Sequence, residues 1–245
     1  MIPQRVLIVG VGGLGCPASL GLARAGVPSL TLVDPDVVEL TNLHRQPWHH
    51  PQDVGQPKVE SAATKLRRAF PALATSTLAE RVTAQNDERL FRDHDLVVDA
   101  TDGVDTKFLL SDAAVLTRTP LIYGGVLRFE GLAMRIEPGG PCLRCLFETP
   151  PDDVPTCAQA GVLGSMAGLI GGLQATLALQ GPGQAGEAML HVIDGRNFSF
   201  RNVRVRRRAD CAACAVGAKP VLQDRSERAD ACLTPASTSP ARSAP

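Results

Sequence analysis

The sequence predicts an α/β fold: a Rossmann-like, mostly parallel sheet covered by helices, continued by antiparallel strands and joined to a structural four-cysteine zinc site. Three observations predict it. Short apolar runs alternate with helix-length segments, a glycine-rich turn follows the first run, and two C-x-x-C pairs lie late in the chain. Strands that are apolar along their whole length are typical of a parallel sheet buried between two layers of helices.

The apolar runs predict the parallel part of the sheet and the helices that cover it. Pro57 suits the first turn of a helix, and the segment that follows it has apolar residues at helical spacing. The predicted strands are 5–9, 29–34, 75–80, 95–99 and 120–124, and the predicted helices are 13–25, 57–69, 104–117 and 161–179.

After Tyr123 the pattern changes, and we expect antiparallel strands. The segment 126–136 predicts one longer strand, with Gly131 as a candidate bulge. The segments 190–194 and 198–205 predict a hairpin. The second of them carries Phe198, Phe200, Val203 and Val205, and this alternation predicts one buried face.

Length and composition limit the function classes. A chain of 245 residues suits one large domain with or without an appendage. We expect a single nucleotide-binding domain over 1–217 and a disordered tail over 218–245, because the tail has no apolar period. Lys+Arg and Asp+Glu are both 25, which argues against nucleic-acid binding. With no visible membrane span or signal peptide, we expect a cytoplasmic protein that is not in a membrane.

The first turn is a dinucleotide-binding fingerprint. Gly10, Gly12, Gly13 and Gly15 follow the apolar run 6–9, and Asp34 ends the next run. Glycines let a phosphate approach the first N–H groups of a helix, and an acid at the end of the second strand can bind ribose hydroxyls. Many dehydrogenases share this pattern. The continuation N-L-H-R-Q makes it more specific, since a triphosphate needs an arginine and hydride transfer does not.

Charged residues follow the fingerprint where strand ends are expected. Arg45 and Lys58 can both reach over the carboxyl edge of the sheet, where ligands bind in open α/β folds. Arginine offers phosphate a bidentate fork and lysine a compact charge; the alternative is two solvated surface cations. Asp99 and Asp102 close the fourth strand. Asp102 is expected to face Mg²⁺, and Asp99 either does the same or caps the next helix.

Four of the seven cysteines form two C-x-x-C pairs, Cys142 with Cys145 and Cys211 with Cys214. In a reducing compartment this spacing favours metal over disulfides. Two thiolate pairs make a closed, tetrahedral zinc site, which can contribute on the order of 10 kcal/mol to folding. The alternative is two redox or unligated pairs.

Several segments together resemble a known family. They are G-V-G-G-L-G, L-V-D-P-D-V-V-E-L-T-N-L-H-R-Q, V-G-Q-P-K, D-A-T-D, the two C-x-x-C pairs and, between these pairs, T-C-A-Q-A-G-V-L-G. They resemble the enzymes that activate ubiquitin-like proteins, and within them the bacterial sulfur-carrier adenylyltransferases of molybdopterin-synthase and thiamine-pathway type (ThiF/MoeB/HesA). The resemblance spans Arg5 to Cys214.

The resemblance implies an activity, cofactors and partners. The reaction would be ATP-dependent adenylation of the C-terminal Gly-Gly carboxylate of a small ubiquitin-fold sulfur-carrier protein, with release of pyrophosphate. Asp34 would hold the ribose, and Asp102 would position Mg²⁺. Asn42, Arg45 and Lys58 would hold and polarise the phosphates. The family precedent is also a homodimer, and the glycine-rich helix 161–179 would either permit such close packing or be internal core.

Cys157 and a row of arginines remain. Cys157 lies 12 residues after Cys145, beside a segment expected to form a mobile loop. In the wider family a cysteine in this region can accept the activated carrier or sulfur; the alternative is a small buried packing residue. We do not expect it to be essential for adenylation. Arg204, Arg206, Arg207 and Arg208 form a basic strip, with all but Arg207 expected on the solvent face. The strip predicts a solvated edge or a docking site for an acidic carrier.

Two features depart from the family's pattern. The usual N-terminal segment, whose R-x-x-R-Q-type arginine enters the partner subunit's nucleotide site, has no counterpart before Arg5. Arg5 and Arg128 are candidate replacements, unless the reading frame begins upstream or nucleotide handling differs. Gly103 stands where the family commonly has Asn. The main alternative function is a catalytically weakened carrier-binding scaffold of the same fold. An NAD-dependent oxidoreductase is more remote, because no proton donor with a substrate clamp is evident.

Overall fold

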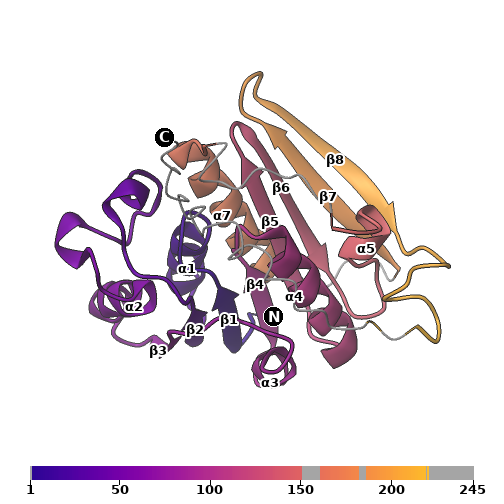
Figure 1. Cartoon of the computed structure of the whole chain (residues 1–245), viewed down its shortest axis with the longest axis horizontal. Helices are drawn as coiled ribbons and strands as arrows, with labels where there is room; N and C mark the ends of the chain where they lie inside the picture. Colours follow the sequence, from indigo (N-terminus) through magenta and orange to yellow (C-terminus); the bar gives the residue numbers. More distant parts are fainter. Residues whose placement is uncertain (1, 151–160, 182–185, 219, 221–245) are drawn as a thin grey trace, which may run out of the picture.

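A computed structural model describes residues 2–150, 161–181, 186–218 and 220. Within these ranges one sheet of eight strands runs in the order β3-β2-β1-β4-β5-β6-β7-β8 (Figure 1). Strands β3 to β5 along this order pair in parallel, and β5 to β8 pair antiparallel. The predicted change of direction within one sheet is therefore confirmed. The strands are β1 (Arg5–Val9), β2 (Ser29–Val33), β3 (Ala74–Leu78), β4 (Leu96–Asp99), β5 (Leu121–Leu127), β6 (Glu130–Ile136), β7 (Glu187–Asp194) and β8 (Ser199–Arg206).

Helices cover both faces of the sheet, and β1 shows why its sequence is apolar throughout. Val6 and Ile8 belong to a core with α1, α2 and α7, whereas Leu7 and Val9 belong to a second core with α3, α4 and α5. Successive side chains of a strand point to opposite faces, so a strand between two helix layers is apolar at every position. The helices are α1 (Gly15–Arg24), α2 (Lys58–Ala69), α3 (Asp87–Arg92), α4 (Val104–Thr117), α5 (Leu143–Leu146) and α7 (Gly164–Leu179), with short 3₁₀ turns η1 (Leu40–Arg45) and η2 (Pro51–Asp53).

Helix α2 begins where its sequence predicts. Pro57 is the N-cap residue, so that Lys58 is the first residue of the helix. The apolar residues at helical spacing, Val59, Ala62, Ala63 and Leu66, are all buried. The positive end of this helix therefore stands at the carboxyl edge of the sheet with a lysine as its first residue.

The prediction of one strand over 126–136 is wrong. Strand β5 ends at Leu127, β6 begins at Glu130, and the turn between them holds Arg128 at a positive φ of 54°. Gly131 is not at a bulge, because it pairs regularly with Val126 and Ile193. A Cβ on Gly131 would lie 2.3 Å from Cδ1 of Ile170, so this glycine lets α7 pack closely on the sheet.

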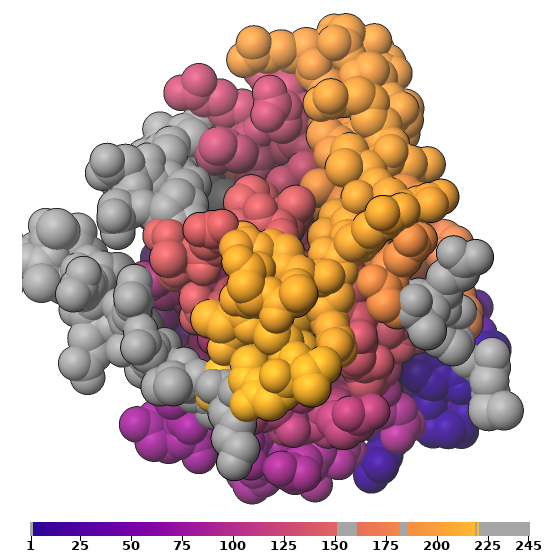
Figure 2. Space-filling view, turned by 90° about the vertical axis from the view of Figure 1, so that its right-hand side faces the viewer, coloured from indigo at the N-terminus to yellow at the C-terminus, as the bar shows by residue number. Residues whose placement is uncertain are grey.

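The prediction of a buried face on β8 is also wrong, because Phe200 and Val203 are an odd number of residues apart. They point to opposite faces. Val205 is buried, whereas the side chains of Phe200 and Val203 are 65% and 43% exposed. Figure 2 shows the β7–β8 hairpin, in orange, along this side of the molecule.

Acids from this chain accompany the predicted basic strip. Both Arg204 and Arg206 approach Glu187, at 3.5 and 3.4 Å. Arg208 pairs with Asp210 and Glu148. The strip is therefore part of an ion-pair network within the chain.

Some expectations fall outside the described residues, among them the tail beyond residue 220 and Cys157. In the described ranges no helix combines the length and apolar character needed to cross a membrane.

The contact between α1 and α7 gives a test of the fold. A Cβ on Gly171 would lie 2.4 Å from the carbonyl oxygen of Leu14, whereas a Cβ on Gly172 would meet no atom within 4 Å. We expect Gly171→Ala to lower the free energy of unfolding by about 1–3 kcal/mol, because backbone atoms must move apart. The matched variant Gly172→Ala should raise it by up to about 1 kcal/mol, because alanine is the better helix former. Urea unfolding measures both, and equal effects would contradict this packing.

Candidate functional site

The turn between β1 and α1 is built from glycines because backbone lies against backbone there. Gly10 has a φ of 92°, and a Cβ on it would lie 2.6 Å from the carbonyl oxygen of Ala100 at the end of β4. A Cβ on Gly15 would lie 1.9 Å from the carbonyl oxygen of Gly10. Gly12 and Gly13 instead face the η1 segment, with Cβ positions 3.3 Å from Gln46 and 3.4 Å from Arg45. This loop is thus enclosed between β4 and η1.

Asp34 stands directly after β2 and is 5% exposed. Its carboxylate accepts hydrogen bonds from the N–H of Val11, at 2.6 Å, and the N–H of Asp36, at 2.9 Å. Burial raises the pKa of Asp34, and this effect exceeds the opposing attraction of Lys58 and of the two N–H groups. The predicted ribose-binding acid therefore also holds the glycine loop in place.

Lys58 is a buried cation surrounded by acids. Its Nζ lies 2.7 Å from Asp36, and its side chain is 8% exposed. Burial by itself lowers the pKa of Lys58, but the carboxylates of Asp34, Asp36 and Asp102 outweigh burial and raise it. The lysine is accordingly protonated at neutral pH. The structure thus brings Lys58 and Asp102, two of the predicted site residues, to the same place.

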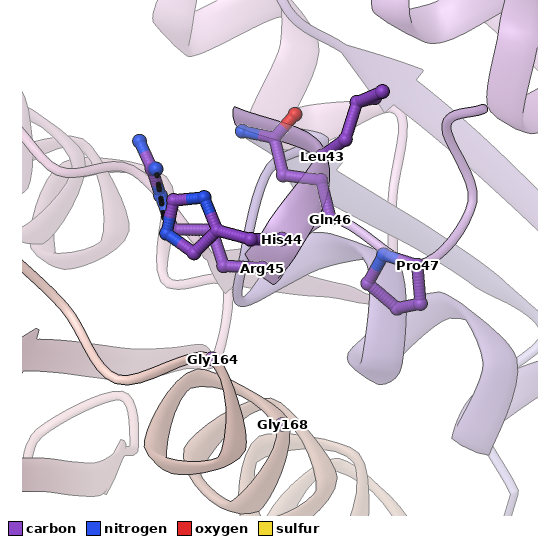
Figure 3. A pocket seen from close by; sticks show the side chains of 7 residues that line it. All are labelled: Leu43, His44, Arg45, Gln46, Pro47, Gly164 and Gly168. Atoms are coloured by element: carbon purple, nitrogen blue, oxygen red, sulfur yellow. Dashed lines mark hydrogen bonds between the residues drawn. The ribbon is translucent and has the colours of Figure 1, made fainter. Parts of the chain in front are cut away.

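Arg45 is held by its own segment. Its Nη2 donates to Oδ1 of Asn42 at 2.6 Å, and Nδ2 of Asn42 donates to Glu39 at 3.2 Å. Asn42 therefore orients the arginine. A pocket of about 200 Å³ opens beside Arg45, between η1 and the first turns of α7. Figure 3 shows His44 and Arg45 extending in one direction and Gln46 in another.

Asp99 does not cap α4, which corrects one of its two predicted roles. It is fully buried, and its carboxylate accepts hydrogen bonds from Lys107, at 3.3 Å, and from Thr101. Lys107 also donates to the carbonyl oxygen of Gly124. Lys107 of α4 therefore joins the end of β4 to the middle of β5. The carboxylate of Asp102 is exposed at the same edge.

The two candidate replacements for the family's arginine stand at opposite ends of the parallel strands. Arg5 begins β1 and pairs with Asp95 at 3.4 Å, at the amino end of the parallel strands. The glycine loop is at their carboxyl end. Arg128 follows the carboxyl end of β5. Because the family's arginine enters the partner subunit's nucleotide site, both residues stay candidates.

Sequence reasoning missed Asp36 and Lys107. Asp36 had a signal, because D-P-D places a second acid two residues after Asp34. Lys107 had a weaker signal, which is a lysine directly before the apolar run Phe108-Leu109-Leu110 in a predicted helix. Neither signal shows which residue forms the ion pair, because Asp36 pairs with Lys58 and Lys107 pairs with Asp99, each from a separate element.

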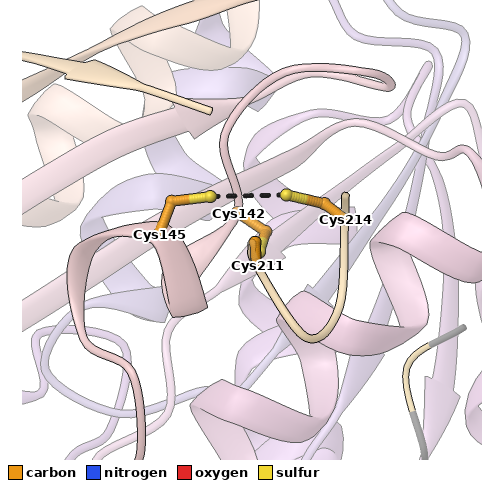
Figure 4. A group of neighbouring side chains, drawn as sticks. All are labelled: Cys142, Cys145, Cys211 and Cys214. Carbon is orange, nitrogen blue, oxygen red and sulfur yellow. Dashed lines mark hydrogen bonds between the residues drawn. The ribbon is translucent and has the colours of Figure 1, made fainter. Parts of the chain in front are cut away.

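The four predicted metal ligands come together (Figure 4). The sulfurs of Cys142, Cys145, Cys211 and Cys214 all lie within 4.8 Å of one another, with pairs at 3.6 and 3.3 Å. Ligands at ~2.3 Å from a tetrahedral zinc ion would be roughly 3.8 Å apart, so the cluster fits this ion. Hydrogen bonding from the neighbouring cysteines, Cys142 first, lowers the pKa of Cys214.

One half of this cluster is also anchored without metal. Arg144, between Cys142 and Cys145, makes a bidentate contact with Asp112 of α4, at 2.7 to 3.1 Å. The N–H of Leu143 donates to Ser111 of the same helix at 3.0 Å. The segment with Cys211 and Cys214, yellow in Figure 2, lies against this half.

Comparisons with known proteins agree with this geometry. Residues 3–213 match the model of the ThiF family. The chain is 45% identical over 217 residues to the adenylyltransferase and sulfurtransferase MOCS3 of Culex quinquefasciatus, covering 86% of this chain and 50% of that protein. It is 41% identical over 229 residues to the SAMP-activating enzyme E1 of Haloferax volcanii, covering 91% of this chain and 85% of the relative.

The fold has counterparts among solved structures. A crystal structure of E. coli MccB with ATP superposes with a TM-score of 0.73 at 20% identity, over 86% of this chain and 67% of that one. The chain spans about half the length of the MOCS3 relative and most of the archaeal one. On the extent of the family match and the identity to these relatives, this chain belongs to the ThiF family.

Proposed function

We propose that this chain uses ATP and Mg²⁺ to adenylate the C-terminal Gly-Gly carboxylate of a small ubiquitin-fold sulfur-carrier protein, releasing pyrophosphate. The observation that supports it is the buried, protonated Lys58, which stands beside the glycine loop with Asp34 and Asp102 around it. Relatives named adenylyltransferase and SAMP-activating enzyme make this chemistry the natural assignment for a ThiF-family chain.

In the proposed reaction the carrier carboxylate attacks the α-phosphorus of ATP. The bond from the α-phosphorus to the bridging oxygen breaks, and pyrophosphate leaves with the electron pair. Lys58 and Arg45 would stabilise the negative charge that develops on the phosphate oxygens. Both are preorganised, Lys58 by Asp36 and Arg45 by Asn42. Charges already held in place stabilise a transition state without having to reorganise.

The proposal assigns the metal-facing role to Asp102. The oxygens of Asp99 are occupied by Lys107 and Thr101, whereas Asp102 is exposed at the same strand end. A carboxylate there could bind Mg²⁺ directly or through water, and Mg²⁺ would supply positive charge to the phosphates.

The partner arrangement and the other sites complete the proposal. We infer a homodimer, located in the cytoplasm. The dimer is supported by two apolar residues at the start of α7, Leu163 and Leu169, which are 46% and 43% exposed. Cys157, outside the described residues, is proposed to be dispensable for adenylation. The four clustered cysteines would hold a structural zinc ion.

The arginine in η1 provides a direct test. We expect Arg45→Ala to lower carrier-dependent ATP–pyrophosphate exchange by about 10²-fold or more, as with removal of other preorganised donors. Arg92→Ala is the matched control, because Arg92 is an exposed arginine on α3 whose partner is Glu88 of the same helix. Unchanged exchange in Arg45→Ala would remove Arg45 from the proposed machinery.

The proposed function is tested by exchange in the presence of Mg²⁺, with Gly-Gly-ended carrier proteins of the same genome added one at a time. Exchange that depends on one carrier would support adenylation and identify the pathway. A folded, zinc-loaded protein that shows no exchange with any carrier would contradict it and favour a carrier-binding scaffold.

Zinc loading gives a separate prediction. We expect one zinc ion per chain by elemental analysis, with a large loss of zinc in Cys214→Ser and none in the control Cys16→Ser, since Cys16 is buried elsewhere. After chelation, amide exchange should accelerate more over 207–218 than over 142–147, because Arg144 and Leu143 keep the latter segment on α4. An unchanged zinc content in Cys214→Ser would refute the assignment of Cys214 as a zinc ligand.

A further inference from the structure

A buried chain of polar side chains reaches the glycine loop from α2. His49, which is 3% exposed, contacts the carbonyl oxygen of Val11 through Nε2, at 2.9 Å. Its Nδ1 lies 2.9 Å from the hydroxyl of Ser61, and Nζ of Lys65 lies 2.9 Å from that same hydroxyl. Lys65 also pairs with Asp53. None of these four side chains has a part in the reaction described above.

The direction of the hydrogen bond to the loop is fixed by the carbonyl oxygen of Val11. That oxygen can only accept, so Nε2 of His49 carries a proton and donates it. In the neutral ring Nδ1 is then the acceptor, and the Ser61 hydroxyl, which accepts from the ammonium of Lys65, can donate to it. Burial lowers the pKa of His49, despite the hydrogen bond with Val11, and the charges of Lys65 and Lys58 act in the same direction. The neutral ring thus fits the geometry.

Holding the Val11 carbonyl sets the direction of the next N–H. In a planar trans peptide the C=O of Val11 and the N–H of Gly12 point in opposite directions. With the C=O turned to the buried His49, the N–H of Gly12 is turned to the other side of the loop. It donates to no protein acceptor in the described part of the chain. The N–H of Val11 is fixed in turn by Asp34.

The same chain relates the loop to the proposed phosphate-binding lysine. Ser61 and Lys65 stand one and two turns after Lys58 on α2. Asp53 ties the far end of the chain to the preceding turn, because it accepts a hydrogen bond from the N–H of His50 at 2.8 Å. A shift of α2 would therefore be transmitted to the loop.

We propose that His49 is a positioning residue in nucleotide binding. Through its hydrogen bond to the Val11 carbonyl it keeps the Gly12 N–H available to a phosphate, and it holds the glycine loop at a fixed position relative to Lys58. This inference rests on the proposed function, in which ATP occupies the loop. His49 touches neither ATP nor the carrier, and the Val11 carbonyl fixes its tautomer.

The test compares three variants in carrier-dependent ATP–pyrophosphate exchange. His49→Ala removes the donor, whereas His49→Gln keeps an N–H donor within reach of the Val11 carbonyl. His94→Ala is the matched control, because His94 also makes two side-chain contacts, with Leu90 and Thr31 at 2.7 Å, away from the loop. Thermal unfolding of all three variants and titration of MgATP by calorimetry accompany the exchange measurements.

We expect His49→Ala to lower kcat/KM for ATP by about 10- to 100-fold, the size of a small misplacement of reacting groups. The KM for the carrier should not change. His49→Gln should recover most of the loss, and His94→Ala should keep wild-type kinetics even if it is as thermally weakened as His49→Ala. Wild-type kinetics in His49→Ala, an equal loss in His94→Ala, or no recovery in His49→Gln would each overturn the inference.

Failure of the proposed function can be told apart from failure of this inference. If the wild-type chain shows no exchange with any carrier, the adenylation proposal fails, and the MgATP titration decides the role of His49. Weaker MgATP binding in His49→Ala but not in His94→Ala supports that role. Equal binding in the wild type and His49→Ala overturns it, as does a wild-type chain that binds no MgATP.

Discussion

The close approach of the glycine loop to the end of β4 is the constraint on which the rest of the structure depends. Neither Gly10 nor Gly15 has space for a Cβ, because the backbone of the loop contacts itself and Ala100. This turn lets α1 start only a few residues after β1. It also leaves the N–H and C=O of Val11 without backbone partners. The N–H donates to Asp34, and the C=O contacts His49.

The site depends equally on a segment far along the chain. Gln174 of α7 is fully buried and donates to the carbonyl oxygen of Asp99 at 2.6 Å. The carboxylate of the same aspartate pairs with Lys107 of α4. The strand end that carries Asp102 is thus held from both faces of the sheet, and the glycine at position 124 leaves the space that Gln174 fills. Helix α7, which lies late in the chain, therefore helps to shape the edge of the sheet where ATP is proposed to bind.

Features that depend on local backbone could be predicted from the sequence. The glycine turn, the start of α2 at Lys58, the alternation of cores along β1 and the two cysteine pairs all follow from residue type and spacing. Features that depend on a distant partner could not. In the run Trp48-His49-His50, nothing in the sequence distinguishes the buried histidine from the exposed one, because Val11 lies 38 residues away. The β5–β6 turn was missed for another reason, since Arg128 adopts a positive φ that favours glycine or asparagine.

The open edge of the sheet has a consequence for how copies of this chain meet. Among the described strands β8 pairs with β7 alone, so its outer backbone groups are available to another strand. Such an edge would attract a second edge of the same kind and begin a growing aggregate. Three arginines, Arg201, Arg204 and Arg206, lie along β8. Charged side chains on an edge strand disfavour such pairing, so these arginines help to keep the sheet from extending into its neighbour.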